Sequence, residues 1–114
     1  MRRTFHLAPL EAWHATDPTA PYRATSLADE GFIHCTDGEL ELIATANRHY
    51  RADDRPFLVV ELDLDLVGSP WTVEDAGGIY PHVFGPIDRA AILEVRALER
   101  APDGAFTAFG PRID

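Results

Sequence analysis

The chain lacks lysine altogether and has a single cysteine among its 114 residues. The absence of lysine excludes a lysine Schiff base and a lysine nucleophile. Cys35 alone cannot close an internal disulfide, which fits a reducing compartment. No apolar run approaches the roughly 20 residues of a membrane span, and the first residues lack the apolar run of a signal peptide. We therefore expect a soluble, cytoplasmic protein with no membrane association.

Positive charge is scarce too, since 10 basic residues face 19 acidic ones and the net charge is −9. Such a surface repels a phosphate backbone, so we expect no nucleic-acid partner. A local group of arginines can still hold the phosphate of a small ligand through paired hydrogen bonds. The length is that of one domain, residues 1–114, built around one hydrophobic core.

Hydrophobic periodicity predicts mostly strands, with a few short helices in the first half of the chain. The predicted strands are 4–7, 32–36, 57–66, 71–74, 92–98 and 105–109, and a hairpin turn at Asp103-Gly104 joins the last two. Within 57–66 apolar residues alternate with Glu61, Asp63 and Asp65, which predicts one buried face and one partly solvated face. This order favours an α+β fold with a largely antiparallel sheet over a βαβ repeat.

The predicted helices are 10–15, 26–30 and a longer one that ends near Tyr50. Thr36 and Glu39 have the spacing of a capping box at the start of the longer helix. Its inward face is expected to consist of Leu40, Ile43, Ala44, Asn47 and Tyr50.

Three of the five histidines, His6, His34 and His82, lie in segments that otherwise resemble buried strand. Burial removes the imidazole nitrogens from water, so they need structural partners or a ligand. Such strands can bring their side chains toward one pocket, which makes these histidines the main candidates for a site. His14 and His49 lie on predicted helices and are expected to face solvent.

His34 shares a strand face with Thr36, next to the start of the longer predicted helix. A helix N-terminus offers free N–H groups and a positive dipole, which suit a phosphate or a carboxylate. The alternative is structural: Thr36 only caps the helix, and His34 bonds a neighbouring carbonyl. Both interpretations remain open.

The segment around His82 has two interpretations as well. Tyr80, His82 and Phe84 share a face if the segment is extended, and that face could form a wall for a base or a sugar. Pro81 and the Gly85-Pro86 pair argue against an ordinary central strand. A corner that is packed for stability is the equal alternative.

Two further chemistries are weaker hypotheses. The histidines lack the ligand spacing of a zinc site, and we expect no metal. His34-Cys35-Thr36 fits the histidine-x-threonine motif of two-histidine phosphoesterases, but neither His6-Leu7-Ala8 nor His82-Val83-Phe84 supplies the second hydroxyl. Cys35 is interpreted as a small core residue.

Several motifs together resemble a known family. They are Ser26-Leu27, Gly31-Phe32-Ile33-His34-Cys35-Thr36, Trp71 to Glu74, and Tyr80-Pro81-His82-Val83-Phe84-Gly85-Pro86-Ile87. From Phe5 to about Leu98 the chain resembles the bacterial and plant domain of unknown function 952. Thr36 stands where serine is commoner in that family, and Phe84 stands where tyrosine is commoner.

This resemblance implies a fold similar to the ADP-ribosyltransferase superfamily, in which a split, mostly antiparallel mixed β structure holds NAD between two small sheets. By position, His6 would hold the ribose on the nicotinamide side, and His34 with Thr36 would shape the nicotinamide pocket. The superfamily's late glutamate has no firm counterpart: Glu74 is the nearest acidic candidate, and His82 lies in the same region.

We therefore expect a domain that binds NAD or an ADP-ribose-like nucleotide. If the domain is an enzyme, it would also process that molecule. Arg23 is assigned to a phosphate, Tyr80 or Phe84 to a ring, and Glu74 or His82 to developing charge or a proton. The expected ligand-binding residues are His6, Arg23, His34, Thr36, Tyr80 and Phe84, and the expected catalytic residues are Glu74 and His82. The alternative is a non-catalytic small-molecule sensor or interaction module, in which the histidines only join the sheets.

Overall fold

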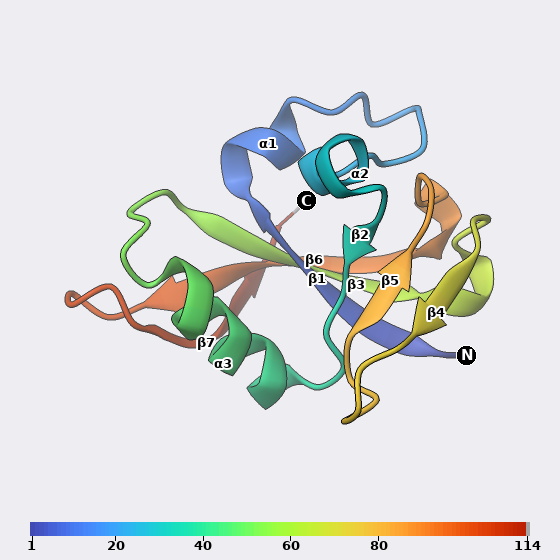
Figure 1. Ribbon diagram of the computed structural model, residues 1–114. Helices are drawn as coiled ribbons and strands as arrows, with labels where there is room; N and C mark the ends of the chain where they lie inside the picture. Colours follow the sequence, from blue (N-terminus) through green and yellow to red (C-terminus); the bar gives the residue numbers. More distant parts are fainter. Residues whose placement is uncertain (114) are drawn as a thin grey trace.

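The computed structural model describes residues 1–113, which form two antiparallel sheets. The larger sheet has the strand order β1–β3–β6–β7, with the bounds Arg3–Pro9, Phe57–Asp63, Ile92–Arg100 and Phe106–Arg112. The smaller sheet has the order β2–β5–β4, with the bounds Ile33–His34, Pro81–Val83 and Trp71–Val73. Figure 1 shows the smaller sheet beside β1, in front of the larger sheet. The predicted α+β class with antiparallel pairing is confirmed.

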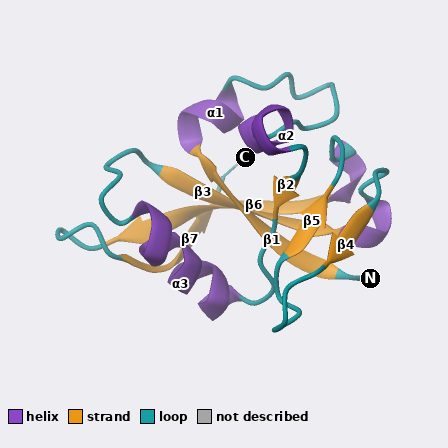
Figure 2. Ribbon diagram, in the orientation of Figure 1, coloured by secondary structure: helices purple, strands orange, loops and turns teal. Residues whose placement is uncertain are grey.

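Three short helices flank the sheets: α1 (Leu10–His14), α2 (Thr25–Glu30) and α3 (Glu39–Tyr50). In Figure 2, α1 and α2 lie together at one end of β1, whereas α3 lies beside β7, away from both. Two 3-10 turns, Leu64–Leu66 and Arg89–Ala91, follow β3 and precede β6. Between residues 1 and 113, no helix is both long and apolar enough to cross a membrane.

Both faces of β3 are buried along the first half of the strand. Leu58, Val60 and Leu62 belong to the core that the two sheets share. Phe57 and Val59 point the other way, into a second core cluster with residues of α3 and β7. The expectation of a partly solvated second face is wrong for this half, because the second core cluster, which includes Leu42 and Ala46 of α3, covers it.

The predicted strand 57–66 ends early, at Asp63. The Asp63 side chain accepts the backbone N–H groups of Arg2 and Asp65, each at 3.0 Å, and is 5% exposed. These bonds direct the chain into a 3-10 turn, so the period-two alternation stops there. Leu66, expected to point inward, is therefore 51% exposed.

The start of α3 differs from the predicted capping box. Gly38 is the N-cap residue at a φ of 94°, and no side chain caps this helix. Thr36 is still part of a sheet: its N–H donates to the Phe5 carbonyl at 2.7 Å, and the Phe5 N–H donates back at 3.0 Å. The capping-box prediction is wrong, because the turn from sheet to helix relies on the positive φ that glycine tolerates.

The inward face of α3 is also offset from its prediction. Leu42 and Ala46 are the buried residues, whereas Leu40 is 77% exposed. Asn47, which was expected to point inward, lies against β7: its amide donates to the Phe106 carbonyl at 3.0 Å and accepts the Phe106 N–H at 2.7 Å. The helix is thus fixed to the larger sheet by both apolar and polar contacts.

β5 is the central strand of the smaller sheet, so the expectation drawn from its prolines is wrong. Pro81 is the first residue of β5, a position at which a missing N–H is tolerated. Its carbonyl still accepts the N–H of Cys35 at 2.9 Å. The punctuated segment is therefore compatible with a short three-residue strand.

The two faces of the smaller sheet differ in chemistry. Ile33 and Val83 are paired across the ladder and fully buried in the shared core. His34 and His82 form the next cross-strand pair, on the opposite face. The period of two therefore turns both histidines away from the core and toward a surface that a ligand can reach.

Candidate functional site

His6 joins the two sheets. Its Nδ1 donates to the backbone carbonyl of His34 at 2.7 Å, and its Nε2 accepts the hydroxyl of Tyr22 at 2.8 Å. The carbonyl can only accept, so these partners assign the proton to Nδ1. Burial lowers the pKa of His6 to about 4. The imidazole is therefore neutral at neutral pH, and both of its nitrogens are occupied.

A cleft of about 700 Å³ opens beside this joint. Its lining residues come from β1, from α1 and α2, from β2 and from α3. Five of the eight predicted site residues line it, namely His6, His34, Thr36, Tyr80 and His82. The structure thus brings together residues from β1, β2 and the segment that leads into β5.

The remaining three predicted residues lie outside the cleft lining. Arg23 is exposed in the chain that leads into α2. Glu74 is exposed just after β4, and its carboxylate accepts the hydroxyl of Thr72 at 3.2 Å. Phe84 is 41% exposed, and its ring packs against Phe32 rather than inside the cleft.

A carboxylate missed by sequence reasoning lies in the cleft beside His34. Glu30 Oε2 is 2.7 Å from His34 Nε2, and both side chains are about half exposed. The contact depends on Gly31, which ends α2 at a φ of 86° and turns the chain back on itself. The four-residue spacing was visible in the sequence, but Gly31 breaks the helix across it, so helical spacing could not predict the pair.

His82 lies next to this pair and is held by stacking. Its ring stacks on Phe32 with centroids 4.1 Å apart and an interplanar angle of 14°. The rings of His34 and His82 are 5.8 Å apart. A carboxylate and two imidazoles therefore border one part of the cleft, and such groups can bind hydroxyls and transfer protons.

Tyr80 lies at another part of the cleft, against α3. Its hydroxyl is 3.4 Å from both Thr45 Oγ1 and Arg48 Nη1, and these two groups lower the pKa of Tyr80. Asp75 fixes the preceding turn, because its carboxylate accepts the N–H groups of Ile79 and Tyr80 at 3.1 and 2.9 Å. Arg48 is another lining residue that sequence reasoning missed.

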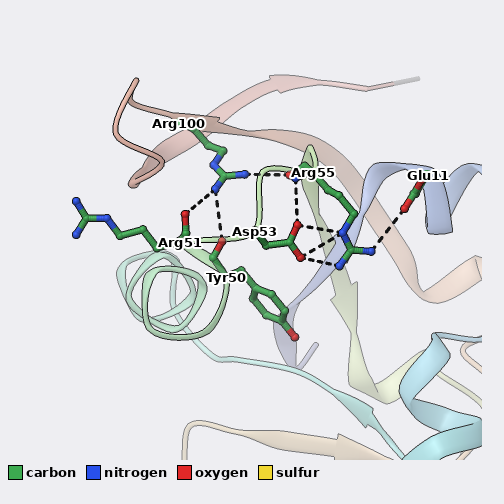
Figure 3. A network of polar contacts seen from close by, with 6 residues as sticks. All are labelled: Glu11, Tyr50, Arg51, Asp53, Arg55 and Arg100. Atoms are coloured by element: carbon green, nitrogen blue, oxygen red, sulfur yellow. Dashed lines mark hydrogen bonds and ion pairs between the residues drawn. The ribbon is translucent and has the colours of Figure 1, made fainter.

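The end of the cleft near Arg55 is occupied by charges that satisfy one another. Figure 3 shows Arg55 against Asp53, with contacts of 2.7 to 3.2 Å, and close to Glu11. Arg55 holds the pKa of Asp53 at about 2. In the same view Arg100 reaches the carbonyls at the end of α3, among them that of Arg51 at 3.1 Å. This network closes the connection between α3 and β3.

Cys35 is buried in the shared core, as expected, and burial raises the pKa of its thiol. Because the thiol is buried among apolar residues, Cys35 is expected to be chemically unreactive. Over residues 1–113, no three His, Cys, Asp or Glu side chains gather closely enough to hold a metal ion. The chemistry available in the cleft is therefore that of imidazole, carboxylate, phenol and guanidinium groups.

Solved structures with the same fold come from Caulobacter crescentus protein CC0527. Its crystal structure gives a TM-score of 0.72 at 21% identity and covers 92% of this chain and 93% of that chain. The crystal structure of a double mutant gives 0.71 at 21%, with the same coverage. The solution NMR structure gives 0.69 at 19% and covers 91% and 90%. At this identity the likeness concerns the fold alone.

No curated protein matches the chain. A family model described as "Protein of unknown function (DUF952)" matches residues 7–95, which is well over half of the sequence. The resemblance inferred from the histidine motifs is confirmed at this level. Because the family model covers well over half of the chain and both histidine motifs lie inside the matched range, the chain belongs to the DUF952 family.

Proposed function

We propose that the cleft binds NAD or an ADP-ribose-like nucleotide and that the fold is of the ADP-ribosyltransferase type. The observation that carries the proposal is the convergence of five predicted residues on one cleft between two sheets. A volume of about 700 Å³ suits a nucleotide-sized ligand, because small-molecule pockets span roughly 300–1,000 Å³. The lining combines aromatic rings with hydroxyl, imidazole and guanidinium groups, which match a base, a sugar and a phosphate.

His34, Thr36 and His82 are the residues that would contact the sugar in this proposal. His34 and His82 lie opposite one another on the exposed face of β2 and β5. Thr36 lines the same cleft. His6 has both nitrogens engaged, so its part is to position β2 rather than to hold the ligand directly.

The Glu30–His34 pair supplies the groups for a chemical step. In cleavage of NAD by water, the bond from ribose C1′ to the nicotinamide nitrogen breaks, and nicotinamide leaves with the electron pair. Water forms the new C1′–O bond and gives its proton to His34. Glu30 would stabilise the positive charge that develops on the ribose, a role that the sequence assigned to Glu74 or His82.

The alternative, a binding module without catalysis, is favoured by one observation. The hydrogen bonds of His6 link β1 to β2 and to Tyr22, which is a structural arrangement. Turnover separates the two functions: release of nicotinamide from NAD supports the enzyme, and binding without release supports the module.

Amide NMR with NAD and ADP-ribose tests the proposal. We expect shifts that cluster on Phe5–Leu7, Phe32–Thr36 and Tyr80–Gly85. Absence of shifts at millimolar concentrations of both molecules would overturn it.

Matched variants locate the binding site. We expect His34→Ala to weaken ADP-ribose binding, because it removes a group on the cleft face of β2, and His14→Ala, on the exposed face of α1, to leave it unchanged. Glu30→Gln should abolish any nicotinamide release, whereas Glu74→Gln should preserve it. The reverse order would return the catalytic role to Glu74.

A further inference from the structure

The Arg48 guanidinium lines the cleft and is available to bind a ligand. Arg55, the other arginine of the lining, is held by Asp53 at 2.7 Å and by Glu11 at 3.5 Å. Within residues 1–113, no carboxylate pairs with Arg48 in this way. Its contact is with the Tyr80 hydroxyl at 3.4 Å, which is a long hydrogen bond. An exposed, unneutralised guanidinium on a protein of net charge −9 is suited to an anion.

Tyr80 adds a second group that can bind the same anion. The Thr45 hydroxyl donates to the Glu41 carbonyl at 2.9 Å, so at 3.4 Å it can only accept from Tyr80. That long bond is easily exchanged for a shorter one to a charged oxygen. Asp75 holds Tyr80 in place through two backbone N–H groups, and the same two bonds offset the negative charge of its carboxylate.

The position of Arg48 and Tyr80 relative to His34 and His82 indicates which part of a ligand would carry the anionic group. Tyr80 and His82 both line the cleft and are only two residues apart in the chain, Tyr80 just before β5 and His82 in its middle. His34 lies directly across the ladder from His82. A phosphate at Tyr80 and a sugar at His82 and His34 would therefore occupy neighbouring parts of one cleft, as the phosphate and the sugar of a single nucleotide do.

We infer that Arg48 and Tyr80 form a subsite for the 5′-phosphate of the ribose that lies against His82 and His34. This inference rests on the proposed function and refines it to ligands with a ribose 5′-phosphate. Arg48 takes the phosphate role that the sequence assigned to Arg23. Thr45 and Asp75 are positioning residues, because they act on the anion only through Tyr80.

Nicotinamide mononucleotide and nicotinamide riboside test the subsite, since they differ only by this phosphate. Their dissociation constants are measured by calorimetry on the wild-type chain and on Arg48→Gln. We expect the variant to bind the mononucleotide about tenfold or more weakly, because a charge-assisted hydrogen bond is lost, and to bind the riboside unchanged. Tyr80→Phe should produce a smaller loss in the same direction.

Arg51→Gln is the matched control. Arg51 lies three residues further along the chain and pairs with Asp103, outside the cleft lining. It should bind both molecules like the wild type. An equal loss of both molecules in Arg48→Gln, or equal wild-type affinity for both, would overturn the subsite while leaving the proposed function in place.

If neither nicotinamide compound binds, inorganic pyrophosphate serves as a second probe. It tests the anion subsite separately from the proposed nucleotide-binding function. The Arg48 side-chain Nε–H and the Tyr80 ring are followed by NMR. Shifts of the Tyr80 ring resonances that occur in the wild-type chain and are absent in Arg48→Gln support the anion subsite even though the proposed function has failed. Unchanged resonances at millimolar pyrophosphate overturn the subsite as well.

Discussion

At the scale of single residues, the state of His6 is determined by burial. The side chain is 5% exposed, and loss of hydration lowers its pKa from the ordinary 6.5 to about 4. The carbonyl of His34 works in the opposite direction but does not outweigh burial. The imidazole is thus a neutral connector between the sheets, and protonation requires that its bond with Tyr22 be reorganised.

We predict that His6 makes the protein less stable in acid. The folded pKa is depressed, so the unfolded chain binds more protons between pH 6.5 and 4, and stability falls as the pH decreases through that window. The full effect is about 3 kcal/mol of unfolding free energy, from 1.36 kcal/mol per pKa unit. Urea unfolding at a series of pH values measures it, with His6→Gln as the non-titrating variant.

His14→Gln, at an exposed position, is the control and should keep the acid dependence of the wild type. The stability difference between wild type and His6→Gln should shrink as the pH falls. A difference that is independent of pH would contradict the prediction. If the variant does not fold, the His6 ring resonances of the wild type supply the test, because they should not titrate until near pH 4.

At the scale of secondary-structure elements, the attachment of α3 to β7 is the clearest example of a polar contact that organises packing. Asn47 makes two hydrogen bonds to the backbone of Phe106, 59 residues further along the chain. Leu42 and Ala46 on the same helix supply the apolar part. The amide therefore fixes the helix along the edge strand, while the apolar contacts alone would let it slide.

We predict that Asn47→Ala lowers the free energy of unfolding by about 2 kcal/mol, because it leaves the Phe106 N–H and carbonyl without partners in a partly buried place. Ala44→Gln, on the exposed face of α3, should change it by less than about 0.5 kcal/mol. Chemical denaturation of both variants gives the comparison. If Asn47→Ala lowers the free energy of unfolding by less than Ala44→Gln does, water replaces both hydrogen bonds to Phe106 and the prediction is wrong.

The elements that the sequence predicts well are those whose pattern is local. The apolar run from Phe57 and the turn at Asp103-Gly104 predict β3 and the β6–β7 hairpin. The errors concern features that depend on distant partners. Thr36 bridges to Phe5, and α3 covers the second face of β3. Neither contact leaves a signal within a window of a few residues.

The candidate site follows the same division. His34 and His82, which line the cleft, could be proposed from the sequence because a histidine between apolar neighbours is visible there. Glu30 was missed because its contact requires the positive φ of Gly31. Arg48 was missed because a solvated helix arginine is an ordinary surface residue until the fold places it beside Tyr80.

At the scale of the whole molecule, the cleft is lined by residues of both sheets. They come from β1 of the larger sheet and from β2 and β5 of the smaller sheet, and α1, α2 and α3 add further residues. A ligand in the cleft would contact all of these elements only when they are folded and correctly placed. Its binding would therefore stabilise the complete arrangement rather than either sheet alone.

We predict that ADP-ribose raises the melting temperature of the protein. At a hundredfold excess over its dissociation constant, a ligand that binds only the folded state adds about 2.7 kcal/mol, which is roughly 10 °C for a domain of this size. Differential scanning fluorimetry measures the shift, and Arg48→Gln at the same concentration should show a smaller one. An unchanged melting temperature at concentrations that saturate the NMR shifts would contradict this coupling.

The bridge between Phe5 and Thr36 has a consequence for dynamics. Each residue gives its amide hydrogen to the other across the line where the sheets meet, at 2.7 and 3.0 Å. These two amides can exchange with deuterium only when that line opens, whereas amides inside β3 require the larger sheet to open. Their exchange rates therefore measure how often the sheets separate, and a nucleotide that spans the cleft should slow both together.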